Sequence, residues 1–392
     1  MFGLELILVI VFAHLIKYPI YRFAPLYACA TGKSLLDGYR GLGKNVIALV
    51  CIIEFPVEVI IIAASSLVTA GIGNYLLSDL GIDVKIFAAA LIALAIATLS
   101  LGGFGFLDRL TKVFVAILTV CTFITTILVA SSAEWGINEM LLPEIDFVTF
   151  AFIIAVMGFM PSAVNLSLIH SLWSVEKEKQ SNHRPSKRQA MLDFNIGYIG
   201  SFVLAVCFLI MGAGVMHSSN IVPVDNPSAF AGQIISLYSN NLGNWSSILV
   251  GVSAFTVMFT TLIAALDGFG RIQSKSLRLL MHDHNKPANK NIEDQRFVDR
   301  TQTLMIVVIG LFACLILFKF LNSFKSFIDF VTIISFLVGP IMAILNHIVM
   351  FDANIPMSFR PSKIMCAWSM LGILVLSALS LAYLCTKFLY NP

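Results

Sequence analysis

Two glutamates lie four residues apart in an apolar run, Glu54 and Glu58 in the string IIEFPVEVII. In a helix this spacing places both carboxyl groups on one face. At membrane depth, desolvation and like-charge repulsion oppose the ionisation of both groups together. Such a pair is suited to carrying a proton, and we interpret it as a candidate proton relay. The alternative is that both side chains are partly hydrated near a helix end and are only structural.

A second candidate lies in residues 147–173, FVTFAFIIAVMGFMPSAVNLSLIHSLW. The stretch is long and apolar, but Gly158, Pro161 and Asn165 interrupt it near its middle. A spanning helix can be broken at that depth only where its freed backbone groups line a cavity or meet an ion. The pattern therefore predicts a broken membrane helix and points to a transport site.

Three side chains of this stretch could act on a cation or a proton. Met160 offers a thioether, a soft ligand that favours Mn²⁺ or Fe²⁺ over Ca²⁺ and Mg²⁺. Pro161 has no N–H, so an upstream carbonyl, expected at Met157, becomes free to bind an ion. Asn165 could offer its carbonyl, and His170 could relay protons. The alternatives are that Met160 fills a gap in the core, Asn165 satisfies backbone groups at the break and His170 is an interfacial residue.

The composition is that of a protein embedded in a membrane. Of its 392 residues 58% are hydrophobic and 12% are charged, whereas a soluble domain has about 25% charged residues. Ten apolar stretches are long enough to cross a hydrocarbon core of about 30 Å. They cover approximately residues 3–27, 46–72, 83–102, 111–131, 147–173, 191–216, 246–270, 302–321, 326–350 and 364–386. We predict an all-α, multi-pass protein with one transmembrane transport domain over residues 1–392.

Lysine and arginine are distributed unequally between the two sides of these spans. The loops on one side hold 19 of the 25 basic residues and the opposite side holds four. The basic side comprises residues 31–45, 103–112, 174–190, 271–300 and 351–363. Because positive loops stay in the cytoplasm, we expect both termini outside, and the short loops favour a bacterial inner membrane. Lys17 and Arg22 lie in the first span, and we expect both side chains to extend towards the cytoplasmic surface.

The order of the spans resembles a leucine-transporter-like plan of two inverted repeats, each opening on a broken helix. Residues 147–350 hold five spans that begin with the broken one, and 364–386 is an extra span. Residues 1–131 hold only four, an incomplete first repeat. A first span that starts almost at Phe2, with no basic segment before it, points to the same gap. We expect one further helix to be encoded upstream of Met1.

Six strings resemble the Nramp family of divalent-metal transporters, the relatives of the natural resistance-associated macrophage proteins, and its prokaryotic branch above all. They are HLIKYP at 14–19, ATGKSLLDGY at 30–39, MGFMP at 157–161, HSLW at 170–173, DFNIGYIG at 193–200 and LDGFGR at 266–271. The similarity runs in order along nearly the whole chain. It implies a leucine-transporter-like fold and proton-coupled transport of Mn²⁺, Fe²⁺ or related ions.

The chain departs from the family pattern at the metal site. The family binds metal with an Asp-Pro-Gly-Asn motif on a broken first helix, and this chain has no such string. On the other broken helix Met160 and Pro161 match, but Ser162 and Ala163 stand where the family has His and Asn. The resemblance therefore implies one half of a metal site, with Met160 as its soft ligand.

The sequence analysis predicts a secondary transporter that imports divalent metal with protons. We see no nucleotide-binding loop, zinc-ligand spacing or Ser/His/Asp set, so we expect neither an enzyme nor a resident cofactor. The expected partners are a divalent metal ion as cargo, protons and the lipid bilayer, without nucleic acid. Two alternatives stay open: an ion-coupled carrier of small organic solutes, and a truncated relative that does not transport.

Overall fold

A computed structural model of the chain describes residues 3–78, 81–101, 104–132, 146–219, 221–281, 292–319, 323–352 and 355–390. All regular secondary structure in these ranges is helical. Ten helices of the described residues are long and apolar enough to cross a membrane. The prediction of an all-α protein with ten spans is therefore confirmed.

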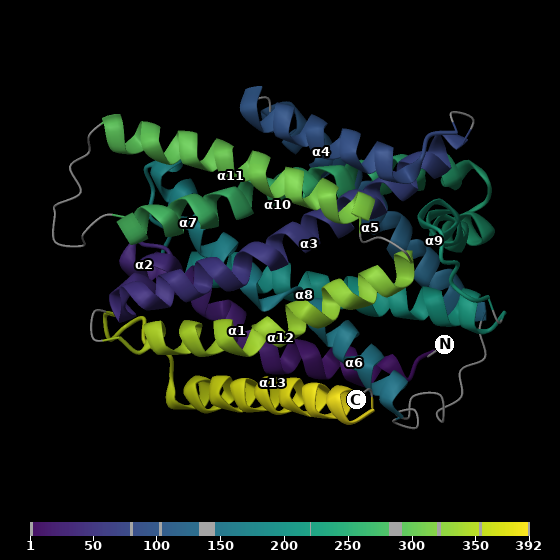
Figure 1. The fold of residues 1–392 in the computed structure, drawn as a ribbon. Helices are drawn as coiled ribbons and strands as arrows, with labels where there is room; N and C mark the ends of the chain where they lie inside the picture. Colours follow the sequence, from purple (N-terminus) through teal and green to yellow (C-terminus); the bar gives the residue numbers. More distant parts are fainter. Residues whose placement is uncertain are drawn as a thin grey trace.

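The spanning helices mostly run along one common direction (Figure 1). They are α1 (Leu6–Thr31), α3 (Lys44–Leu76), α4 (Val84–Leu101), α5 (Phe104–Ser132), the pair α6 (Phe147–Phe159) and α7 (Ser167–Ser181), α8 (Lys187–Met211) with the π-helical turn η4 (Gly212–His217), α10 (Trp245–Met281), α11 (Ile292–Lys319), α12 (Phe324–Met350) and α13 (Lys363–Tyr390). Two shorter helices are α2 (Leu35–Leu42) and α9 (Pro227–Leu242). The helices α7 and α10 run past the predicted spans as polar extensions.

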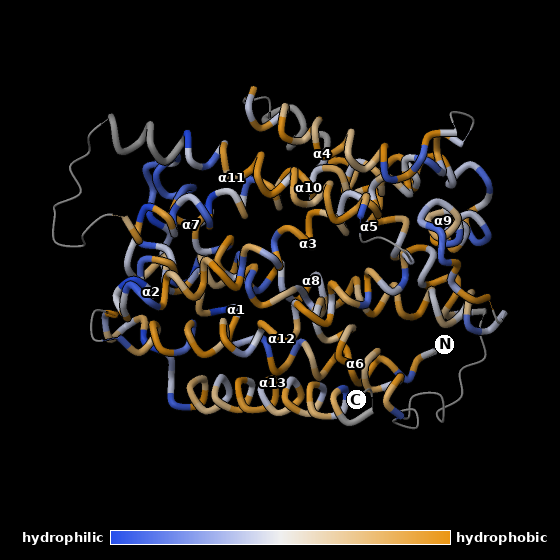
Figure 2. The backbone as a smooth tube through the Cα atoms, in the orientation of Figure 1, coloured by the Kyte–Doolittle hydropathy of each residue, from blue (hydrophilic) through white to orange (hydrophobic). Residues whose placement is uncertain are grey.

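Hydrophilic residues gather most densely at the end of the bundle that carries α2 and the outer part of α7 (Figure 2). We call this the basic end, because the loop residues 31–45 and 174–190 meet there. The middle of the bundle is apolar along its length, as a hydrocarbon environment requires. Helix α1 begins and α13 ends at the opposite end (Figure 1), as ten crossings require.

Four helix pairs bring the candidate residues together. Helix α3 packs along α10, α6 packs against α12, and α1 lies against α8 and α7. Gly158 explains how closely α6 approaches α12, because a Cβ atom at this position would lie 2.1 Å from the Thr332 carbonyl oxygen. Only glycine allows the two backbones to touch there.

The start of α7 is fixed by a buried hydrogen-bond chain from two other helices. The Tyr39 hydroxyl of α2 donates to Asn346 Oδ1 of α12 at 2.6 Å. The amide nitrogen of Asn346 in turn donates to Ser167 Oγ at 3.0 Å. All three residues are fully buried, so this chain anchors the first residue of α7 inside the bundle.

Candidate functional site

The predicted break lies in the middle of the span 147–173. Helix α6 ends at Phe159, the backbone of Met160–Ala163 is not helical, and the 3₁₀ turn η3 (Val164–Leu166) leads into α7. The Met160–Pro161 peptide bond is cis. The missing N–H of Pro161 removes a helical hydrogen bond, so carbonyl groups upstream of the break need other partners.

Lys17 of α1 is the partner that these carbonyl groups find. Its ammonium donates to the carbonyl oxygens of Met157 at 2.5 Å, Gly158 at 3.3 Å and Ser162 at 3.3 Å. The residue is only 1% exposed. The prediction that Lys17 extends to the cytoplasmic surface is therefore wrong, because three unpaired carbonyls inside the bundle stabilise the charge better than a long reach to water. Arg22 is half-buried and donates to the Tyr18 hydroxyl.

The sequence-predicted ligands lie on different sides of the break. Met157 is buried, and its carbonyl is engaged by Lys17. Met160 caps the end of α6, and its partly buried side chain packs against the core. Asn165 is buried on η3 and points to α3, where its amide donates to Glu54 Oε2 at 2.7 Å. The alternative that Asn165 serves the backbone at the break is not what the structure shows.

Glu54 and Glu58 are both fully buried, which contradicts the alternative that they are partly hydrated. Each carboxyl group accepts one hydrogen bond from a neutral amide: Asn165 serves Glu54, and Gln273 of α10 serves Glu58 at 2.7 Å. The second oxygen of each carboxyl group has no hydrogen-bond partner among the described residues, and neither has Asn165 Oδ1. A buried oxygen without a hydrogen-bond partner can bind a proton donor or a cation, so this face of α3 still has acceptor atoms to offer to either.

A cavity of about 540 Å³ reaches the break from the basic end. Pro161 and Ser162 lie at its inner part, together with Tyr21, whose hydroxyl donates to the Ser162 carbonyl at 2.5 Å. His170 and Asp193 line it further out. His170 is exposed to this space, as a proton relay requires. The cavity therefore joins the unwound segment to the surface of the bundle.

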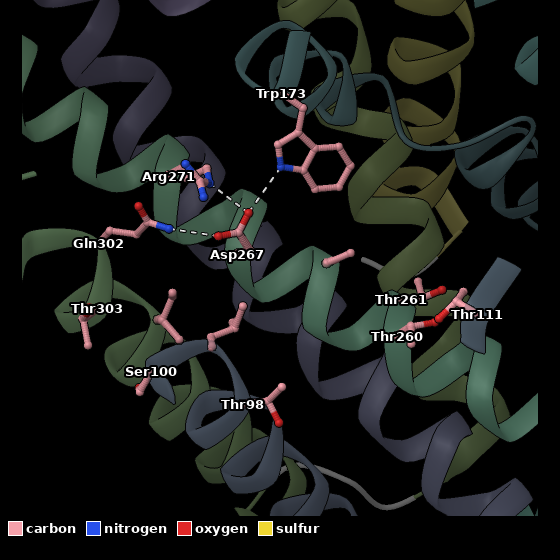
Figure 3. Close-up of a pocket in the computed structure, with 13 residues that line it drawn as sticks. Thr98, Ser100, Thr111, Trp173, Thr260, Thr261, Asp267, Arg271, Gln302 and Thr303 are labelled. Carbon is pink, nitrogen blue, oxygen red and sulfur yellow. Dashed lines mark hydrogen bonds and ion pairs between the residues drawn. The ribbon is translucent and has the colours of Figure 1, made fainter. Parts of the chain in front are cut away.

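A second cavity, of about 630 Å³, lies between α4, α5, α10 and α11. Figure 3 shows Asp267 at its wall, with Trp173, Arg271 and Gln302 directed towards the carboxylate. Arg271 Nε and Asp267 Oδ2 are 2.8 Å apart, an ion pair between residues four positions apart on α10. The Trp173 indole donates to Asp267 at 3.3 Å and Gln302 donates at 2.9 Å, so this carboxylate ties α7 to α10 and α11.

No group of three or more His, Cys, Asp or Glu side chains that could hold a metal is found among the described residues. The donors beside the break are backbone carbonyls and the Met160 thioether, whereas the unpartnered oxygens of Glu54 and Asn165 lie on the side that faces α3. Hard oxygens with one soft sulfur suit a divalent ion of intermediate softness.

Sequence reasoning missed Lys17, Tyr21 and Gln273 as parts of the site. A lysine in the middle of the first span was a usable signal, because an intramembrane charge needs a partner inside the bundle. Tyr21 lies four residues further on and therefore on the same face of α1. Nothing in the local sequence singled out Gln273.

The comparisons with known proteins agree with this architecture. A protein of Pasteurella multocida (strain Pm70), the uncharacterized protein PM0681, is 31% identical over 354 residues, or 88% of this chain and 77% of that protein. Two structures of the Eremococcus coleocola manganese transporter match with a TM-score of 0.63 and 16% identity. One is a mutant, of which the match covers 83%, and the other a complex with an aromatic bis-isothiourea substituted compound, of which it covers 82%. They cover 100% and 99% of this chain.

The family-level comparison covers almost the whole chain. The profile of the family described as natural resistance-associated macrophage protein-like (Nramp) matches residues 1–386. Proteins of this family are transporters rather than enzymes, in agreement with ten apolar helices and a helix broken inside the bundle. The chain is thus a multi-pass membrane protein that belongs to the Nramp family.

Proposed function

We propose that this protein is a secondary transporter that carries divalent metal ions such as Mn²⁺ or Fe²⁺ into the cell together with protons. The cargo is a transported ion, and no resident cofactor is part of the proposal. The membrane is the bacterial inner membrane, with the basic end in the cytoplasm.

The observation that carries this proposal is the unwound segment Met160–Ala163. It lies at the inner part of a cavity that opens to the basic end, and the carbonyl groups beside it already hold a positive charge. Irregular backbone inside a membrane bundle is found where it lines a path for ions or solutes. A protein of the same fold is named a manganese transporter, which favours a divalent cation as cargo.

We assign the cation ligands to the Met160 thioether, the Met157 carbonyl and Asn165 Oδ1. Asn165 Oδ1 is available, because it has no partner among the described residues. The Met157 carbonyl can become available, because it is held by Lys17, whose long side chain can move away. Proton transfer is assigned to Glu54 and Glu58, whose buried carboxyl groups each keep one unpartnered oxygen.

His170 completes the proposed proton path on the side of the basic end. It lines the same cavity as Pro161 and Ser162, and it lies on α7 about one turn closer to the break than the polar extension of that helix. A histidine changes its charge in the physiological range more easily than any other side chain, so it suits the exchange of a proton with water in that cavity.

Mn²⁺ uptake into proteoliposomes tests the proposal, with Met160→Ala compared with the wild type. We expect wild-type uptake to be inhibited by Cd²⁺ more strongly than by Mg²⁺ or Ca²⁺, and Met160→Ala to lose roughly tenfold in affinity for Mn²⁺ and Cd²⁺ with little change for Mg²⁺. Met365→Ala is the matched control, because Met365 of α13 is also partly buried at the edge of the core. Absence of Mn²⁺ uptake by the wild type would reject the proposed function.

A carrier of small organic solutes is the second candidate. One observation favours it: the ammonium of Lys17 places a positive charge at the break, against carbonyl groups that carry no charge of their own. A solute with a carboxylate group would suit that ammonium better than a dication does. Uptake of radiolabelled amino acids by the same proteoliposomes, without Mn²⁺ uptake, would select this candidate.

A further inference from the structure

The ammonium of Lys17 is bound in the way that a free cation would be bound. It has three N–H donors, and the described structure offers three carbonyl oxygens, those of Met157, Gly158 and Ser162. Two of these oxygens belong to the last turn of α6 and one to the unwound segment. The break is therefore a complete cation site whose occupant is attached to α1.

No carboxylate forms an ion pair with Lys17 among the described residues, so backbone carbonyl groups alone stabilise the charge. Neutral carbonyl oxygens attract an ammonium and a dissolved metal cation through the same ion–dipole interaction. What favours Lys17 is its attachment, because a tethered group has a high effective concentration at the site.

The carbonyl groups of Met157, Gly158 and Ser162, which form a cradle for the ammonium, also lie beside a cavity. The Ser162 carbonyl accepts from both Lys17 and Tyr21, and Ser162, Tyr21 and Pro161 line the cavity that opens to the basic end. A cation bound at the Met157 carbonyl would have to share this oxygen with the Lys17 ammonium. Two positive charges at such a short separation repel each other strongly in a medium of low dielectric constant.

We propose that Lys17 is a tethered competitor of the transported cation. The ammonium and the cation compete for the Met157 carbonyl, which belongs both to the carbonyl cradle and to the proposed set of cation ligands, and the return of the ammonium displaces the cation into the cavity. This inference rests on the proposed function and adds a specificity-determining and release-promoting residue to it. The four-carbon stem of lysine allows the ammonium to leave and return without a change in the helix backbone.

The test measures two quantities on the purified full chain at one fixed pH: the Mn²⁺ dissociation constant by calorimetry and the initial rate of Mn²⁺ uptake into proteoliposomes. The variants are Lys17→Met, which keeps the length of the side chain without donors, and Lys17→Gln, which keeps two donors without charge. Arg22→Met is the matched control, because Arg22 is a basic residue of the same helix whose hydrogen bond goes to Tyr18 instead of the break.

We expect Lys17→Met to bind Mn²⁺ about tenfold tighter or more, as for a site freed from an occupant present at least about 90% of the time. Its maximal uptake rate should fall, because the group that promotes release is gone. Lys17→Gln should change both quantities in the same directions by smaller factors, and Arg22→Met should leave both within about twofold of the wild type. If Lys17 had only a structural role, its substitution would instead lower the Mn²⁺ affinity and the Mn²⁺ uptake rate together.

Wild-type affinity in a folded Lys17→Met protein, or weaker binding than the wild type, would overturn the inference. If Lys17→Met does not fold, Lys17→Gln decides in the same way. If the wild type transports Mn²⁺ and neither substitution changes affinity or rate, the competitor role of Lys17 is rejected but the proposed function is not. If neither the wild type nor either variant binds or transports Mn²⁺, the proposed function fails and the inference fails with it.

Discussion

At the residue scale, Glu54 and Glu58 are held by neutral amides rather than by cations. Asn165 and Gln273 each donate one hydrogen bond, which orients a carboxyl group but does not compensate a buried negative charge. Cys51 donates its thiol hydrogen to the same Gln273 at 3.0 Å, so this amide is itself fixed in place. The pair is therefore rigidly placed and electrostatically uncompensated, which is the arrangement expected of groups that exchange protons.

Replacement of either glutamate by glutamine should uncouple transport from the proton gradient. Glu54→Gln and Glu58→Gln preserve shape but cannot release a proton, so Mn²⁺ uptake should persist at equal pH and lose most of its stimulation by an inward proton gradient. Uptake into proteoliposomes with and without the gradient measures this ratio. Asp83→Asn, at an exposed carboxylate that caps the start of α4, is the control that should keep the ratio. Unchanged proton dependence in both glutamate variants would contradict the relay.

At the element scale, the contact of α6 with α12 determines where the break can lie. The backbone of α6 touches that of α12 at Gly158, only two residues before the unwound segment begins. The last turn of α6 is consequently clamped from two sides, by α12 through this contact and by α1 through Lys17. The first turn of α7 is held separately, through Ser167 and Asn346.

A methyl group at Gly158 should force these helices apart. Gly158→Ala should lower the free energy of unfolding by about 1–3 kcal/mol, as overpacking of a tight contact does, and should reduce Mn²⁺ uptake because the cradle carbonyls move with α6. Thermal unfolding of the purified protein measures the stability. Gly200→Ala on α8 is the matched control, since its added Cβ would meet no atom within 4 Å. That variant should be as stable as the wild type or up to about 1 kcal/mol more stable.

At the scale of the whole molecule, an ion pair closes the basic end. Asp37 of α2 and Lys275 of α10 are 2.5 Å apart, with 19% of each side chain exposed. Asp37 also accepts from the N–H and the hydroxyl of Ser34, which forms a capping box at the start of α2. Burial alone would raise the pKa of the Asp37 carboxyl, but the Lys275 ammonium and the hydrogen bonds from Lys275 and Ser34 hold the pKa below its usual value.

This ion pair should make the stability of the fold depend on acid pH. Because the pKa of Asp37 is lower in the folded than in the unfolded chain, its contribution is fully present above the unfolded value of about 3.9 and is lost as pH falls through the folded value. Asp37→Asn should lower the free energy of unfolding by about 1.5–3 kcal/mol at pH 7 and converge with the wild type in strong acid. Denaturant unfolding from pH 7 down to about pH 2 measures this difference and its disappearance in acid.

The control for that experiment is Glu176→Gln. Glu176 lies 3.7 Å from Lys179 in a surface pair of α7, with 35% and 68% of the two side chains exposed, and such pairs contribute about 0–1 kcal/mol. The substitution should therefore leave the acid dependence unchanged. A wild-type-like acid profile of Asp37→Asn would show that the ion pair does not hold the basic end together.

Local sequence patterns predicted the helices and the break but not the occupant of the break. Apolar length alone predicts the ten spans, and Gly158 with Pro161 predicts the interruption, because these signals act within one turn of helix. Glu54 and Glu58 were found for the same reason. The carbonyls that hold Lys17 are about 140 residues away along the chain. Only the packing of α1 against α6 brings Lys17 to these carbonyls. The rule that a lysine in a span extends to the membrane surface considers one helix alone, and it therefore predicted the wrong position for this side chain. The division into repeats 1–131 and 147–350 stays a prediction.

The position of Trp173 has a consequence for how the bundle can move. Its side chain lies in the wall of both cavities, and its indole is bonded to Asp267 of α10. The outer part of α7 is thus fixed to α10 and α11, whereas α6 and, through Ser167 and Asn346, the first turn of α7 are fixed to α12. A displacement of α10 and α11 against α12 would therefore act on α7 between these two attachments, directly beyond the unwound segment Met160–Ala163. We expect such a displacement to widen the cavities and to disturb the carbonyl cradle together.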